Sequence, residues 1–159
     1  MSTPHATLTS AQLEWKNGQP VSSQFDDIYF SSLDGWAETQ AVFIRQNNLE
    51  NRWKDLSPGS AFTIGETGFG SGLNFLCALA LWLKTAPSDC VLHYISTEKH
   101  PLKKIDLEGI ISHWNDTAVI PESLKPLCTE LIAGYPLPLA IHYRCLAFTA
   151  WNWPREEFS

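Results

Sequence analysis

Several patterns that would point to a particular class of protein are absent from this 159-residue chain. Its four cysteines form no C-x-x-C pair and its five histidines show no metal-ligand spacing, so neither a disulfide framework nor a metal site is predicted. No Ser-His-Asp or Cys-His arrangement is recognisable. Eleven Lys and Arg residues against 17 Asp and Glu residues give a net charge of −6, which argues against nonspecific binding to nucleic acid.

Long apolar runs are also missing. The stretch from Leu73 to Leu83 is too short to span a bilayer, and the N-terminus lacks the basic, apolar and small-residue order of a signal peptide. We therefore expect a cytoplasmic protein without a membrane partner, whose cysteines are buried free thiols. What is present is a 44% hydrophobic content with seven Trp and eight Phe, typical of a single globular domain.

The most informative segment runs from residue 62 to residue 76 and reads F-T-I-G-E-T-G-F-G-S-G-L-N-F-L. A β-prone run leads into glycines at positions 65, 68, 70 and 72, and an apolar helical stretch follows from Leu73. Glycines let the backbone turn sharply and let a ligand approach it closely, and a helix N-terminus offers free N–H groups. The order therefore predicts a ligand site at the carboxyl end of a parallel strand.

The spacing of these glycines separates the kinds of ligand. A dinucleotide site of the form G-x-G-x-x-G, counted from Gly68, needs a third glycine where Leu73 stands. A P-loop counted from Gly65 needs a lysine where Ser71 stands. The remaining pattern is an acidic residue, Glu66, followed by alternate glycines, and it is similar to the first motif of S-adenosylmethionine-dependent methyltransferases.

Three blocks carry a narrower resemblance. Residues 13–30 (LEWKNGQPVSSQFDDIYF), 65–76 (GETGFGSGLNFL) and 95–102 (ISTEKHPL) stand in this order along the chain. Together they resemble the methyltransferase domain of the MnmC family. Members of this family are bifunctional bacterial enzymes that complete the 5-methylaminomethyl-2-thiouridine modification at the wobble position of tRNA. The resemblance covers roughly residues 10 to 135.

This resemblance implies an α/β fold of the Rossmann-like, S-adenosylmethionine-dependent methyltransferase type. It implies methylation of 5-aminomethyl-2-thiouridine, with tRNA as the substrate and S-adenosylmethionine as the cofactor. FAD belongs to the family's second, oxidase domain, to which nothing in this chain corresponds. The residues that the resemblance carries over as cofactor-binding are Glu66, Gly68, Phe69, Gly70, Gly72, Asn74 and Glu98.

Two acidic residues are central to the expected site. In the family, the position of Glu66 lies close to the methionine end of the cofactor; the alternative is an exposed turn carboxylate that balances a helix N-terminus. Glu98, at the end of the second strand, can accept hydrogen bonds from both hydroxyls of a ribose. The alternative for Glu98 is a solvated surface position.

The catalytic residues are unassigned, and three candidates lie in the first block of resemblance: Asp26, Asp27 and Tyr29. They would line the aminomethyl-uridine pocket, where a carboxylate attracts the substrate amine; equally, they could be turn-capping carboxylates and a packed aromatic. Lys99, Lys103 and Lys104 either contact tRNA phosphates or form a solvated helix face. No feature of the sequence predicts an oligomeric state.

Two units are expected along the chain: an N-terminal hairpin and cap region over residues 1–60, and the front part of a cofactor-binding α/β domain over residues 61–159. The expected strands are 13–15, 20–22, 61–64 and 91–97. The expected helices are 39–46, 73–84, 101–111 beginning at Pro101, and 123–133 capped by Ser123. A loop is expected over 55–60. Strands that alternate with helices predict a parallel sheet.

Beyond about Tyr135 the sequence departs from the resembling family, whose Gly-Asp and Leu-Asp-Gly-Phe-Ala-Pro stretches do not occur here. We therefore expect a truncated chain whose sheet is incomplete, with an unpaired edge and an impaired methyltransferase activity. Two other classes of function stay open. One is a non-catalytic remnant or interaction module, and the other is a fragment of a dinucleotide-binding oxidoreductase.

Overall fold

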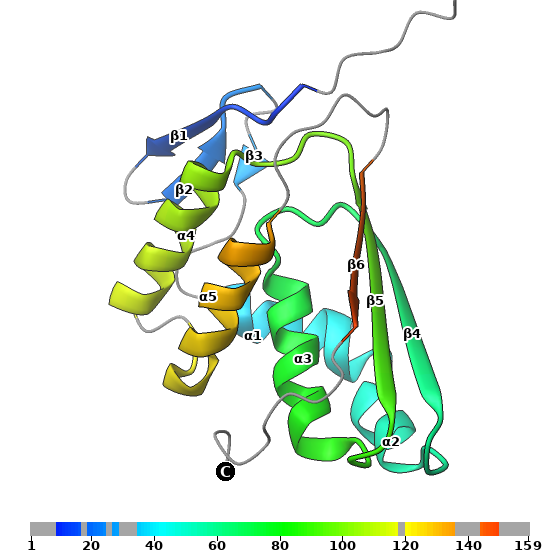
Figure 1. Ribbon diagram of the computed structural model, residues 1–159. Coiled ribbons are helices and arrows are strands. Elements are labelled where there is room, and N and C mark those ends of the chain that lie inside the picture. The colour runs from blue at the N-terminus through cyan, green and yellow to red at the C-terminus, as the bar shows by residue number, and fades with distance from the viewer. Residues whose placement is uncertain are drawn as a thin grey trace, which may run out of the picture.

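The structure is a computed structural model that describes residues 9–16, 19–24, 27–28, 35–117, 120–135 and 144–149. Figure 1 shows a three-stranded sheet flanked by helices on one side, with a second, smaller sheet at one end. The α/β class predicted from the sequence is confirmed. Within the described residues no helix is both long and apolar enough to cross a membrane.

The small sheet is the predicted N-terminal hairpin with one short strand added. β1 (Leu13–Lys16) pairs antiparallel with β2 (Gln19–Ser22), and β2 pairs antiparallel with β3 (Asp27–Ile28). The hairpin is held on the main domain at two points. The Ala11 N–H donates to the Pro101 carbonyl at 3.0 Å, and the Trp15 ring packs edge-on against His113 with centroids 5.4 Å apart.

A short helical layer follows. It consists of α1 (Gly35–Thr39), the π-helix η1 (Gln40–Arg45) and α2 (Leu49–Lys54). The helix expected over 39–46 is therefore present, although its hydrogen bonding is of the π type, as in the bond from the Gln46 N–H to the Ala41 carbonyl. The segment from 55 to 60 is a loop, as expected.

The main sheet is built around a parallel pair. β4 (Ala61–Thr67) lies beside β5 (Val91–Glu98) in parallel register, with Thr67 opposite Thr97 at the carboxyl ends. The helix α3 (Leu73–Thr85) connects them, so the predicted β-α-β unit is confirmed. β6 (Arg144–Thr149) pairs antiparallel with the other side of β5. The strand order β4-β5-β6 leaves β4 at an edge of the sheet, among the strands the structure describes.

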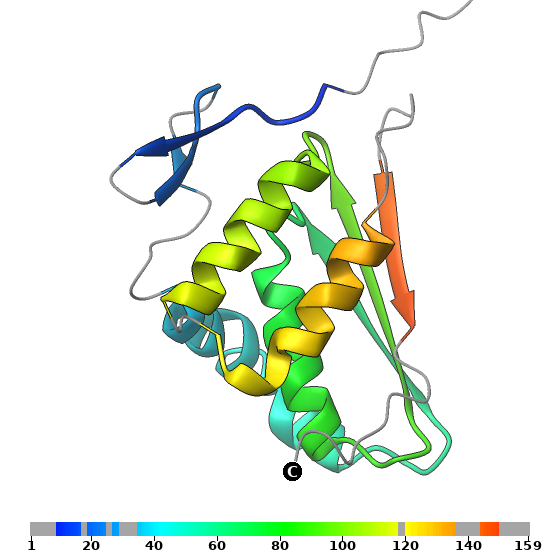
Figure 2. The same ribbon diagram turned by 60° about the vertical axis from the view of Figure 1, so that its left-hand side comes forward.

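The helix α3 is apolar on nearly every face because it is enclosed by other elements. Eight of its residues are buried, and its Trp82 ring packs edge-on against Trp53 of α2 with centroids 5.3 Å apart. Helices α1 and α2 contact it from one side. The turned view in Figure 2 places α3 between this layer, the sheet and α5. The hydrophobic core is thus centred on α3.

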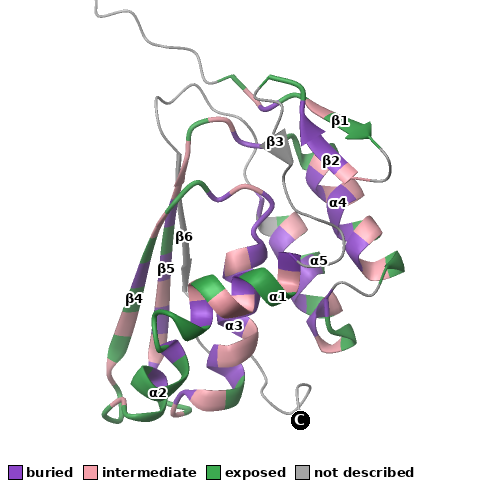
Figure 3. Cartoon of the chain, turned by 180° about the vertical axis from the view of Figure 1, so that it is seen from behind, coloured by how far each residue is buried: buried purple, intermediate pink, exposed green. Residues whose placement is uncertain are grey.

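The sheet is covered on one face only, within the part of the chain that the structure describes. Burial alternates along both parallel strands: Ile64, Leu92 and Tyr94 are buried towards the helices, whereas Thr63 and Ile95 are exposed on the opposite face. Figure 3 shows this alternation as bands along β4 and β5. Parallel strands usually have both faces covered, so this half-buried pair is unusual.

Two predicted helix starts were wrong. The first helix after β5, α4, spans Lys104–Asp116, so Pro101 precedes it and is not its first residue. The hydrogen bond that the Pro101 carbonyl accepts from Ala11 holds this segment outside the helix, and the Lys103 carbonyl accepts the first helical bonds. Ser123 does not cap a helix either.

Ser123 lies inside a 3₁₀ turn, η2 (Glu122–Leu124), that leads into α5 (Lys125–Gly134). A proline in the first turn of α5 needs no N–H partner, so the helix begins there without a side-chain cap. The apolar stripe predicted for this helix is confirmed, because Leu124, Leu127 and Leu131 are all buried.

Three cysteines give a test of this core. Cys77, Cys90 and Cys128 are buried free thiols, and burial raises the pKa of Cys128 to about 11. Because the thiolate is the reactive form, at pH 8 only about one Cys128 in a thousand is reactive. In a Cys145→Ser variant we expect Ellman's reagent to label fewer than one thiol per folded chain within minutes, and three after unfolding in guanidinium. Fast labelling of two or more thiols in the folded chain would contradict the packing.

Candidate functional site

The glycine-rich segment forms a loop at the carboxyl end of β4. Gly68, Gly70 and Gly72 all have positive φ angles, of +84°, +56° and +84°. Only glycine adopts this conformation without strain, so the alternate glycines are required by the backbone path itself. The Gly68 N–H donates to the Thr97 carbonyl at 2.7 Å, which joins the loop to the end of β5.

The three glycines face different surroundings. A Cβ atom added at Gly68 or Gly70 meets no other atom within 4 Å, so open space lies over the backbone at both positions. A Cβ atom at Gly72 would lie 2.8 Å from the Phe69 ring and 3.2 Å from Leu131 of α5. The first two positions can therefore admit a ligand, whereas the third is needed for packing.

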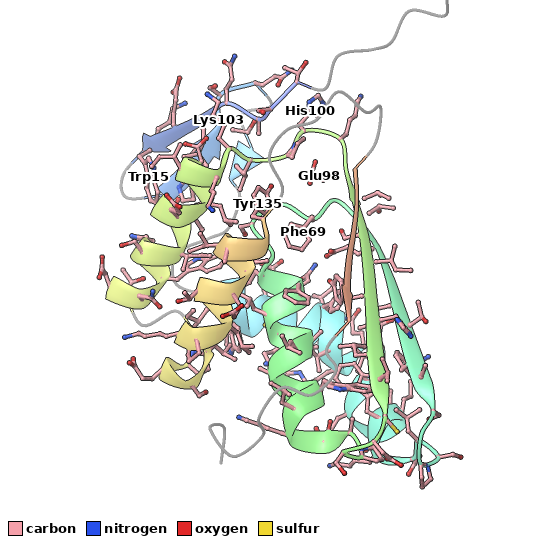
Figure 4. The ribbon with its side chains drawn as sticks, in the orientation of Figure 1. Trp15, Phe69, Glu98, His100, Lys103 and Tyr135 are labelled. Carbon is pink, nitrogen blue, oxygen red and sulfur yellow. The ribbon has the colours of Figure 1, made fainter. Side chains whose placement is uncertain are left out.

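Phe69 points away from the open side of the loop. Its side chain is 3% exposed, and its ring packs on Tyr135 and Phe75, with centroids 6.4 Å from each. Figure 4 shows Phe69 beside Tyr135, at the end of α5. Of the residues predicted to bind a cofactor, Phe69 is thus placed in the hydrophobic core, where it fixes the loop to α3 and α5.

Glu98 holds the loop from the side of β5. Its carboxylate accepts the Gly70 N–H at 2.9 Å through one oxygen and the His100 N–H at 2.8 Å through the other. The Glu98 side chain is half-buried rather than fully solvated. The sequence prediction placed Glu98 at the end of the second strand next to the glycines, and the structure brings these groups together.

Glu66 lies on the helix-facing side of β4, one strand away from Glu98. Its carboxylate accepts a hydrogen bond from Asn74 of α3 at 2.8 Å and one from the Ser96 hydroxyl at 2.8 Å. Burial raises the pKa of Glu66, an effect that these two hydrogen bonds partly oppose and the nearby Glu98 charge adds to. Glu66 is therefore an internal carboxylate that links β4, β5 and α3, not an exposed turn residue.

Ser96 and Tyr94 belong to this cluster but were missed from the sequence. Ser96 has no exposed surface, and Tyr94 lies on the same face of β5, two residues earlier. Burial and the neighbouring Glu66 charge raise the pKa of Tyr94, so its hydroxyl stays protonated. The sequence did contain a signal for Ser96. Alternate residues of β5 face the core, so Ser96 follows Leu92 and Tyr94 at a buried position, and a buried hydroxyl needs a hydrogen-bond partner.

The three catalytic candidates lie at the margin of the described structure. Asp26 and Tyr29 are outside the described residues, and only the backbone of Asp27 is described, in β3 opposite Ser22. Figure 1 places β3 at the end of the molecule where β4 and β5 have their carboxyl ends. Among the described residues no group of three His, Cys, Asp or Glu side chains is arranged to hold a metal ion.

A separate groove of about 250 Å³ lies along the free edge of β4. It is lined by Phe43, Asn47, Leu49, Arg52 and residues 62–65. Its charged member, Arg52, lies 4.7 Å above the Phe62 ring and thereby has a structural partner. The groove contains none of the loop glycines from 68 to 72, so it is distinct from the site at the carboxyl ends of the strands.

The chain is similar to several known proteins, and no family model matches it. Three similar proteins are each called tRNA 5-methylaminomethyl-2-thiouridine biosynthesis bifunctional protein MnmC. The one from Legionella pneumophila (strain Corby) is 44% identical over 151 residues, which is 94% of this chain and 22% of the relative. The one from Methylobacillus flagellatus is 48% identical over 128 residues, or 80% of this chain and 18% of the relative.

The third, from Pseudomonas fluorescens, is 50% identical over 127 residues, which is 79% of this chain and 19% of the relative. The resemblance seen in the sequence motifs thus extends to alignments that cover 79–94% of the chain at 44–50% identity. The chain spans about a fifth of the length of these relatives.

The half-buried Glu66 carboxylate predicts a dependence of stability on pH. A carboxyl whose pKa is raised on folding favours the folded state while it is protonated, and this contribution is lost as the pH rises from the unfolded value of 4.5 through the raised pKa. In Glu66→Gln, the amide can still accept from Asn74 and can donate to the Ser96 hydroxyl. We expect the difference in Tm between Glu66→Gln and the unsubstituted protein to become more positive from pH 4 to pH 8.

Glu98→Gln is the matched control in the same thermal unfolding series. Glu98 accepts two backbone N–H groups, and an amide has only one acceptor oxygen, so this variant should lose about 1 kcal/mol of stability near neutral pH. If the Tm difference for Glu66→Gln does not become more positive from pH 4 to pH 8, and this variant loses as much Tm as Glu98→Gln at pH 8, the distinction between the carboxylates is wrong.

The packing role of Gly72 predicts an unequal response to alanine. Gly72→Ala combines a left-handed conformation, which costs about 1–2 kcal/mol, with overpacking against Phe69, which costs about 1–3 kcal/mol. Gly59→Ala has a similar φ of +70° and open space, so only the first cost applies. Urea unfolding should show the larger loss for Gly72→Ala, and equal losses would show that the contact with Phe69 is easily relieved.

Proposed function

We propose that this chain forms the S-adenosylmethionine-binding part of a methyltransferase that modifies the wobble uridine of tRNA. The observation that carries the proposal is the open space over Gly68 and Gly70, in a loop that Glu98 holds at the carboxyl ends of two parallel strands. The names of the relatives supply the biological context, since each is a protein of 5-methylaminomethyl-2-thiouridine biosynthesis in tRNA. The proposal assigns this chain to the methylating activity of those bifunctional proteins.

The residues fit the proposed cofactor. Backbone without side chains at Gly68 and Gly70 lets a nucleoside or amino-acid group approach closely. Within the described residues no side chain caps the N-terminus of α3 at Gly72, and a helix N-terminus offers N–H groups to a carboxylate or to other acceptors. Glu98 is the group that would hold a ribose diol, by sharing or exchanging the N–H groups it now accepts.

Glu66 has a supporting part in this proposal. Both of its oxygens are already engaged, by Asn74 and by Ser96, and these bonds fix the start of α3 relative to the two strands. Glu66 and Asn74 would therefore shape the end of the pocket that receives the amino-acid portion of the cofactor. Phe69 would hold the glycine loop in place, because its buried ring anchors the loop in the hydrophobic core.

The cofactor supplies an electrophilic methyl group attached to a sulfonium. Transfer to an amine needs little from protein side chains beyond orientation, exclusion of water and a group that keeps the amine unprotonated. Asp26, Asp27 and Tyr29 remain the proposed groups for this last role. Of these three, the backbone of Asp27 is described, in β3, and Figure 1 shows β3 at the end of the molecule where β4 and β5 have their carboxyl ends.

The test is a calorimetric titration of the 159-residue chain with S-adenosylhomocysteine, with NADH as the comparison ligand. Gly70→Val should abolish binding, because a side chain there fills the open space above the loop. Gly59→Val is the matched control, since it places the same side chain in open space at a positive φ away from the site. Binding of S-adenosylhomocysteine should survive in this control.

Each other result favours a different function. Binding of NADH in preference to S-adenosylhomocysteine would favour the dinucleotide-binding oxidoreductase, despite Leu73 at the third glycine position. No binding of either ligand by a folded chain would favour a non-catalytic interaction module. Equal binding by Gly70→Val and the unsubstituted protein would remove the glycine loop from the site.

A further inference from the structure

Three lysines lie between the end of β5 at Glu98 and the first residue of α4, in a segment to which the proposed cofactor site assigns no role. Lys99, Lys103 and Lys104, called here the lysine surface, are all exposed. Within the described residues none of the three has an ion-pair partner. In contrast, Lys54 pairs with Glu50 and Lys125 pairs with Glu122.

Two of these lysines are also poorly placed for the stability of their own helix. Lys103 is the N-terminal flanking residue of α4 and Lys104 is its first residue. A helix N-terminus carries a partial positive charge, so a cation there lowers the stability of the helix. Among the residues that the structure describes, neither helix stability nor an ion pair accounts for the charges of Lys103 and Lys104. Local rules that are broken in this way are expected at functional positions.

The lysine surface adjoins the candidate site through the chain and in space. Lys99 directly follows Glu98, and the His100 N–H donates to the Glu98 carboxylate. Figure 4 shows Lys103 and His100 at the same end of the molecule as Glu98 and Phe69. A large substrate that brings a reactive group to the glycine loop would therefore pass over these lysines.

The geometry points to the lysine surface as a contact for the phosphate backbone of a folded RNA, the substrate class of the proposed function, on which this inference rests. Lysine ammonium groups neutralise phosphates without reading bases. A bound phosphate would also offset the unfavourable charge at the start of α4. With three such contacts, the dependence of log K on log salt concentration should have a slope of about −2 to −3 from this surface.

The experiment measures fluorescence anisotropy of a labelled tRNA transcript with the 159-residue chain, from 25 to 200 mM KCl. The triple variant Lys99→Gln, Lys103→Gln, Lys104→Gln should bind at least 10-fold more weakly at the lowest salt, with a slope shallower by about 2. Lys54→Gln, Lys84→Gln, Lys125→Gln is the matched control, with the same change of charge. Figure 1 shows these control positions, on α2, at the end of α3 and at the start of α5, away from the start of α4.

Two further readouts make the outcome decisive. The lysine-surface variant should keep or raise the Tm, because it relieves the helix start, so a lowered Tm with weaker binding would overturn the inference in favour of a structural role. Equal loss of binding in both triple variants, or no tRNA binding by the unsubstituted chain, would also overturn it. Titration of the same samples with S-adenosylhomocysteine separates the two proposals. If the folded chain does not bind S-adenosylhomocysteine, the proposed function is refuted. The difference in tRNA binding between the two triple variants decides the RNA contact.

Discussion

The candidate site depends on one carboxylate that joins two backbone segments. Glu98 accepts an N–H group from the glycine loop after β4 and another from the segment after β5. Without this bridge, the two loops would be connected here mainly by the bond from Gly68 to Thr97. Parallel pairing of the strands brings Glu98 within reach, because the carboxyl ends of β4 and β5 meet at the same edge.

The remaining features of the site are arranged around this bridge in two directions. Towards the interior, Phe69 and Gly72 pack against α3 and α5, and Glu66 bonds to Asn74 and Ser96. Towards the outside, Gly68 and Gly70 leave the backbone bare. The same loop therefore combines a rigid inner side with an accessible outer side, which is the arrangement that a binding site on a fixed scaffold requires.

The sequence predicted the parts of this structure that local patterns determine. The hairpin was predicted from Asn17-Gly18, a dipeptide typical of tight turns, between the β-prone residues 13–15 and 20–22. The β-α-β unit and the glycine loop were predicted from apolar runs and from glycine spacing. What could not be predicted depends on contacts between distant segments. Pro101 lies outside α4 because Ala11, 90 positions earlier in the chain, bonds to its carbonyl. The inward direction of Phe69 depends on Tyr135, which directly follows α5 much later in the chain.

The position of β4 at the edge of the sheet has a consequence for hydrogen exchange. Along a parallel strand, alternate N–H groups point to opposite sides, so those of β4 that face β5 are bonded while the others face away from the described sheet. The two sets belong to one strand and share its global stability. Amide deuterium uptake along β4 should therefore alternate residue by residue, whereas β5, with a neighbour on each side, should be protected throughout.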